Sequence, residues 1–110
     1  MRKVTAYQIE ANALIDELIA ELRKLTFADA MSLPEVSGER ELTLGGIQSS
    51  VTVFAQRDVD NLPGAVLVTV LVARKRLFGA VSFHTDRGLV FSPDGTVRDA
   101  TDRELLDSGG

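Results

Sequence analysis

Hydrophobic positions recur at helical spacing over the first quarter of the chain. Polar and charged residues fill most of the positions between them. The hydrophobic residues follow steps of three and four: Tyr7, Ala11, Leu14, Leu18, Leu22 and Leu25, with Ile15 and Ile19 widening the stripe. At 3.6 residues per turn, this pattern predicts an amphipathic helix of about five turns with one buried face. Thr5 and Gln8 have the spacing of a capping box at its start.

A second, shorter helix is predicted before the pattern changes. Thr26 is placed to cap a helix over residues 27–31, and Pro34 disfavours helical backbone in the residue before it. From Glu35 onward the apolar positions suit strands, at residues 39–44 and 47–56. Gly45-Gly46 lies between them and predicts a tight hairpin turn, because such turns need positive φ.

The third predicted strand, residues 65–77, is apolar on both faces over its first part. Val66, Val68, Val70 and Val72 form one row and are assigned to the helix side. The other row, which contains Leu67, Thr69 and Leu71, is assigned to the opposite side, called here the outer face. A strand with two apolar faces lies at the centre of a sheet or has a partner on its second face.

Shorter elements complete the prediction. The turn residues at 58–64 indicate a loop, and a strand follows at 80–85. Asp86-Arg87-Gly88 fits a three-residue hairpin loop with Gly88 left-handed, leading to a return strand at 89–91. A turn is expected at 92–95, and Thr101 and Glu104 form a capping box for a short helix ending at Leu106.

Together these elements predict one α+β domain over residues 1–107 and a disordered tail at 108–110. The expected architecture is an N-terminal amphipathic helix packed on a four- or five-stranded antiparallel meander, with a short C-terminal helix. No motif identifies a family. The general arrangement is similar to small bacterial binding modules such as immunity proteins and secretion chaperones, an analogy of fold alone.

The amino-acid composition and charge argue against several kinds of site and function. The 110 residues include no cysteine, so disulfides and thiolate metal sites are excluded, and we expect a cytoplasmic protein. The net charge is −4, and the one basic cluster is at residues 74–76, which argues against nucleic-acid binding. The longest apolar run, residues 65–73, is interrupted by Thr69 and is too short for a membrane-spanning helix.

Candidate chemistry is weak in this sequence. His84 is the single histidine, and Ser82 and Asp86 lie near it. However, alternate residues of one strand have Cβ atoms about 7 Å apart, too far for a ready nucleophile–base hydrogen bond. The acidic segment 58–61 lacks the ligand and glycine positions of a calcium loop, because Leu62 and Pro63 occupy them. We therefore predict no catalytic residue, no cofactor and no metal site.

The outer face is the best candidate for a functional surface. It combines apolar with small polar residues, as interaction surfaces do, and we predict that it binds a protein partner or a second copy of the chain. The predicted partner-binding residues are Thr52, Phe54, Leu67, Thr69, Leu71, Ser82 and His84.

Three alternatives remain open for this surface and for the function. The terminal segment around Leu105 and Leu106 would cover the outer face within the molecule. A small-ligand site or hydrolase-like enzyme would use a pocket between helix and sheet, lined by Tyr7, His84 and Asp86. The chain would otherwise be a structural domain of a larger assembly.

Overall fold

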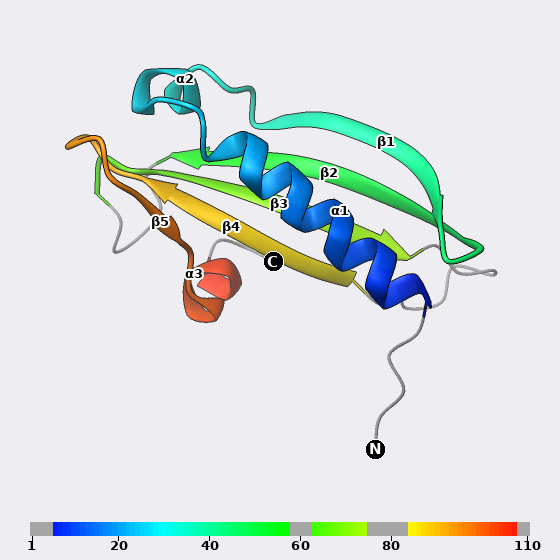
Figure 1. Cartoon of the computed structure of the whole chain (residues 1–110). Coiled ribbons are helices and arrows are strands. Elements are labelled where there is room, and N and C mark those ends of the chain that lie inside the picture. Colours follow the sequence, from blue (N-terminus) through cyan, green and yellow to red (C-terminus); the bar gives the residue numbers. More distant parts are fainter. Residues whose placement is uncertain (1–5, 58–62, 75–83, 108–110) are drawn as a thin grey trace.

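The computed structural model describes residues 6–57, 63–74 and 84–107. They form a five-stranded antiparallel sheet in sequence order, β1-β2-β3-β4-β5, with three helices (Figure 1). The elements are α1 (Ala6–Leu22), α2 (Phe27–Met31), β1 (Val36–Leu44), β2 (Ile47–Arg57), β3 (Val66–Arg74), β4 (His84–Phe91), β5 (Val97–Asp99) and α3 (Asp102–Asp107). This arrangement confirms the predicted α+β class, the helix on a meander sheet and the short C-terminal helix.

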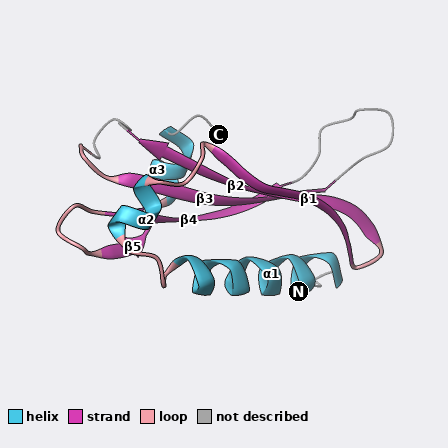
Figure 2. Ribbon diagram, turned by 90° about the horizontal axis from the view of Figure 1, so that it is seen from above, coloured by secondary structure: helices cyan, strands magenta, loops and turns pink. Residues whose placement is uncertain are grey.

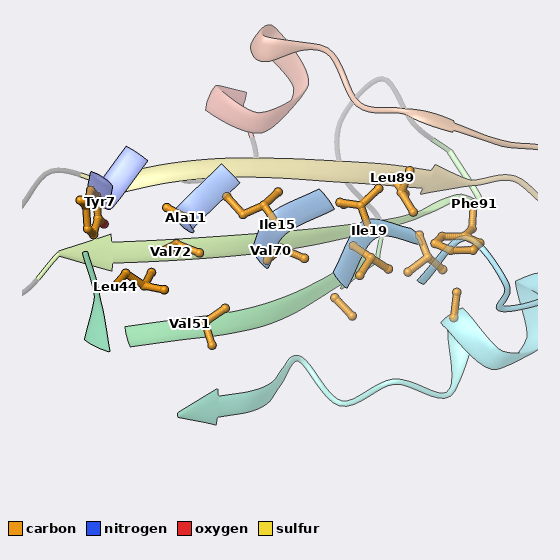
Figure 3. Close-up of a cluster of buried hydrophobic side chains, with 14 residues drawn as sticks. Tyr7, Ala11, Ile15, Ile19, Leu44, Val51, Val70, Val72, Leu89 and Phe91 are labelled. Carbon is orange, nitrogen blue, oxygen red and sulfur yellow. The ribbon is translucent and has the colours of Figure 1, made fainter. Parts of the chain in front are cut away.

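Helices α1 and α3 lie on opposite sides of the sheet, as Figure 2 shows. The side chains that α1 buries are four residues apart: Tyr7, Ala11, Ile15 and Ile19. They pack against the inward row of the central strands, including Val51, Val70 and Val72 (Figure 3). The leucines of the predicted stripe, Leu14, Leu18, Leu22 and Leu25, flank this line and are partly buried. Packing of this apolar face, more than helix propensity, is what holds α1 on the sheet.

The β1–β2 hairpin ends against the start of α1. Gly45 and Gly46 have φ values of 55° and 79°, which confirms the predicted tight turn. The Gly45 backbone approaches α1 so closely that an added Cβ would lie 2.4 Å from the Tyr7 nitrogen. The Glu10 carboxylate accepts a hydrogen bond from the Gly45 N–H. Glycine is therefore needed here both for its conformation and for its lack of a side chain.

The predicted hairpin loop at Asp86-Arg87-Gly88 is wrong. These residues lie inside β4, where Asp86 pairs with Leu71 and Gly88 pairs with Thr69 of β3. Gly88 is not among the glycines with positive φ. Local turn chemistry favoured a loop, but hydrogen bonding along β3 holds the segment extended. Strand β5 was not predicted; it pairs with β4 after the turn at Ser92–Gly95, which is confirmed.

Two of the predicted helix caps are confirmed. Thr26 and Asp29 exchange side-chain and backbone hydrogen bonds of 3.1 Å in both directions, which forms a capping box for α2. Thr101 and Glu104 exchange the same two kinds of hydrogen bond at α3, at 2.8 and 3.1 Å. The predicted cap at Thr5 and residues 80–83 of the strand predicted at 80–85 lie outside the described residues. Within the described ranges, no helix is long and apolar enough to cross a membrane.

Candidate functional site

The strand register brings the predicted outer-face residues together. Thr52 pairs with Leu71, and Phe54 pairs with Thr69. The next strand extends these rows, because Leu71 pairs with Asp86 and Ala73 pairs with His84. Directly opposite residues in an antiparallel pair share a face of the sheet. Ser82 lies outside the described residues, and His84 is placed only by its backbone pairing.

Two observations identify this face as the one turned away from α1. The alternate residues of the same strands, such as Val51 and Val70, belong to the core beneath α1. Arg87, next to Asp86, forms an ion pair with Asp16 of α1, so Arg87 is on the helix side. Because neighbouring strand residues point to opposite faces, Asp86 lies on the outer face.

One end of the outer face is covered by α3. Leu67 of β3 and Val90 of β4 have exposed fractions of 0% and 1%, and they form a second apolar cluster with Ala65 and Leu105. The terminal segment thus covers this end within the molecule, as one of the alternatives predicted. Leu67 was predicted to bind a partner, but its side chain is enclosed by this cluster.

Gly88 provides the space into which α3 fits. A Cβ at this position would lie 2.9 Å from Leu105 Cδ2 and 3.0 Å from the Val68 carbonyl oxygen. The Ala100 N–H donates a 2.8 Å hydrogen bond to the Gly88 carbonyl oxygen, which holds the chain close to β4 just before α3 begins. Because Gly88 has no side chain, it leaves a gap in the sheet surface that Leu105 occupies. We call this gap the Gly88 notch.

A charged pair fixes α3 to β5. Two Arg98 nitrogens donate to the two Glu104 carboxylate oxygens, at 2.8 and 2.6 Å. The Thr101 N–H donates to Glu104 Oε1 at 2.8 Å. The hydrogen bond from Arg98, followed by that from the Thr101 backbone, lowers the pKa of Glu104 to about 2. Bidentate pairing of this kind adds geometric specificity as well as energy.

Apolar residues of the outer face outside the Leu105 cluster keep some exposed surface. Val36 of β1 is 50% exposed and pairs with Phe54, which is partly exposed, as are Leu71 and Ala73. We call Val36, Phe54, Leu71 and Ala73 the outer patch. Thr52 and Thr69, also predicted to bind a partner, lie between these side chains and are 9% and 8% exposed.

Sequence reasoning missed Val36. The predicted strand began at Glu39, whereas β1 begins at Val36 and has an irregular register between Ser37 and Arg40. An extra residue in one strand interrupts the alternation of inward and outward side chains. The face of Val36, which precedes the irregular segment, therefore could not be predicted from the alternation that follows it. Val36 was the one apolar residue between Pro34 and Leu42, a faint signal at best.

The pocket alternative finds little support in the geometry. Tyr7 belongs to the cluster of buried side chains between α1 and the sheet (Figure 3). Asp86 lies on the other side of the sheet, so these two proposed lining residues do not converge. Among the described residues, no group of three or more His, Cys, Asp or Glu side chains could hold a metal ion.

Comparison with known proteins adds no relative to this picture: no family model, no curated protein and no solved structure matches the chain.

Proposed function

We propose that this chain is a non-enzymatic protein-interaction module that self-associates through the outer patch. The observation that carries the proposal is the incomplete cover of the outer face. Helix α3 buries Leu67 and Val90, but Val36 remains 50% exposed beside a partly exposed Phe54. Apolar residues grouped on a sheet face, rimmed by polar ones, are typical of interaction surfaces.

The outer patch is a place where charge does not oppose a second copy. The chain carries a net charge of −4, so most surfaces of two copies repel each other. The four residues of the outer patch are uncharged, and Asp86, opposite Leu71, lies at its border. A two-fold symmetric dimer, the commonest form of oligomer, places the same patch on both sides of the interface and brings neutral surfaces together.

The face of the sheet is a better docking site than its β1 edge. Strand β1 ends the described sheet on one side, and its register is irregular between Ser37 and Arg40. Arg40 and Glu41 are exposed on this strand. Bulges and charged side chains are the features by which natural sheets discourage edge-to-edge pairing. Both features support association through the outer patch.

Light scattering over a range of protein concentrations tests the proposal. We expect the parent chain to dimerise and the Leu71→Glu variant to remain monomeric, because the interface would then bury a carboxylate from each copy. Ile9→Glu is the matched control, since Ile9 is 58% exposed on α1, on the other side of the sheet. A parent that stays monomeric at every concentration, or a Leu71→Glu variant that dimerises like the parent, would contradict self-association.

A further inference from the structure

The apolar surface of the outer face continues beneath α3. Leu67 and Leu71 belong to the same row of β3, with Thr69 between them. Leu67 pairs with Val90, so the two buried residues extend the row of the outer patch toward β5. A molecule without α3 in place would present one continuous surface from Phe54 and Leu71 to Leu67 and Val90.

Among the described side chains, α3 places fewer in an apolar cluster than α1 does. Helix α3 has six residues, whereas α1 has 17 and buries four side chains in the main core. Among the residues of α3 whose side chains the structure describes, Leu105 is the one in the apolar cluster. A helix this short is unstable by itself in water, so its structure depends on these contacts.

The charged contact that holds α3 is accessible to solvent on one side. The Arg98 side chain is 49% exposed and that of Glu104 is 18% exposed. Water can therefore compete for Arg98 whenever Leu105 leaves its notch, and the pair separates at a modest cost compared with an enclosed pair.

We infer that α3 is a detachable cover of the outer face, which opens while the rest of the fold stays intact. Opening withdraws Leu105 from the Gly88 notch and exposes Leu67 and Val90. The enlarged surface binds a second copy of the chain more tightly than the outer patch alone does. The last step rests on the proposed function, whereas the opening of α3 is a property of the single molecule.

The absence of cysteine from the sequence allows a direct test of opening. Val90→Cys places a thiol beneath α3, and Val70→Cys places one beneath α1; the two valines are 1% and 0% exposed. In native buffer and at high dilution, a thiol reagent should label the Val90→Cys protein at least about tenfold faster, because local opening requires less free energy than global unfolding. Equal labelling rates for the two proteins would overturn the inference.

Weakening the Arg98–Glu104 ion pair should change the labelling rate of one thiol and not that of the other. Glu104→Gln should speed the labelling of Val90→Cys several-fold and leave the labelling of Val70→Cys unchanged. Glu21→Gln, which removes a surface ion pair with Lys24 on α1, is the matched control and should change neither rate. Acceleration of both thiols by Glu104→Gln would show that α3 opens only with the whole fold and would overturn the inference.

Amide exchange in the unsubstituted protein gives a second measurement that needs no cysteine variant to fold. The Ala100 N–H, bonded to Gly88, should exchange much faster than the Val70 N–H at the centre of the sheet. It should exchange faster still in Glu104→Gln. Equal exchange rates for the two amides would contradict the proposed opening of α3, as equal labelling rates for the two thiols would.

The association step is measured separately. Glu104→Gln should shift the monomer–dimer equilibrium toward the dimer, and adding Leu71→Glu should reverse that shift. Fast Val90→Cys labelling with no change in association would support the opening of α3 and contradict its effect on self-association. Slow labelling together with a dimer that Leu71→Glu disrupts would contradict the opening of α3 and support the proposed self-association.

Discussion

Leu105 of α3 rests on the sheet at Gly88, where its Cδ2 would be 2.9 Å from a Cβ on the glycine. The relationship explains a glycine in the middle of a strand, where this residue normally weakens the structure. It also explains how a six-residue helix can lie close enough to bury Leu67 and Val90. A residue predicted to turn the chain instead provides the contact surface for the C-terminal helix.

Gly88→Ala should therefore act through Leu105. We expect a loss of about 1–2 kcal/mol in the free energy of unfolding, because the added methyl overlaps the leucine and crowds the Val68 carbonyl oxygen. Urea unfolding of the single variant, of Leu105→Ala and of the double variant forms a double-mutant cycle. The cost of Gly88→Ala should fall in the Leu105→Ala background. Fully additive costs would show that the overlap with Leu105 is not the cause.

Gly45→Ala should be more damaging. The position combines a φ of 55° with a separation of 2.4 Å between an added Cβ and the Tyr7 nitrogen, so the hairpin and α1 must separate. We expect a loss of about 2–4 kcal/mol in the free energy of unfolding, measured in urea. Gly46→Ala is the control: it has the same kind of backbone, with φ at 79° and no atom within 4 Å, and should cost about 1 kcal/mol. Equal costs would place the whole effect in backbone conformation.

The sequence was most informative where interactions between nearby residues and packing between distant ones favour the same structure. The stripe from Tyr7 to Leu25, the caps at Thr26 and Thr101, and the Gly45-Gly46 turn all depend on neighbours in the chain. The row assignment of β2 and β3 followed from the two-residue period and is confirmed by the register.

Failures arose where distant pairing decides the structure. Asp86-Arg87-Gly88 has the composition of a turn, and nothing nearby in the sequence shows that β3 pairs along the whole segment. The bulge in β1 hid Val36 in the same way. For the candidate site, periodicity placed Thr52, Phe54, Leu67 and Leu71 on one face. It could not show how far Leu105 covers them, because that depends on the path of the chain through β5.

Acid should weaken the attachment of α3. The pKa of Glu104 is about 2 in the folded chain, below its ordinary value of 4.5. A lowered pKa contributes stability that is complete above the unfolded value and is lost as pH falls toward the folded value. We expect Glu104→Gln to lower the free energy of unfolding by about 1 kcal/mol at neutral pH, the modest figure reflecting the exposure of Arg98. The difference from the parent should shrink between pH about 5 and about 2, since protonation then removes the same charge.

Urea unfolding of both proteins across this pH range checks the expectation. Asp94 provides a contrast, because hydrogen bonds from Thr96 also lower its pKa but it lies in the exposed turn before β5. Asp94→Asn should therefore leave thiol labelling of Val90→Cys unchanged at neutral pH. A difference between the parent and Glu104→Gln that stays constant from neutral pH to pH about 2 would contradict the role assigned to the ionised carboxylate.

Leu67 and Leu71 lie four residues apart in one row of β3, with Thr69 between them, and should have separable roles. Leu67 is completely buried under Leu105, so Leu67→Ala should lower the free energy of unfolding of the monomer by about 2–4 kcal/mol. Leu71 is partly exposed in the outer patch, so Leu71→Ala should cost about 1 kcal/mol or less in the monomer and weaken dimerisation instead. Urea unfolding at high dilution and sedimentation at rising concentration measure the two effects. Similar losses of monomer stability, with association unchanged by Leu71→Ala, would mean that Leu71 serves the fold and that the outer patch does not bind a second copy.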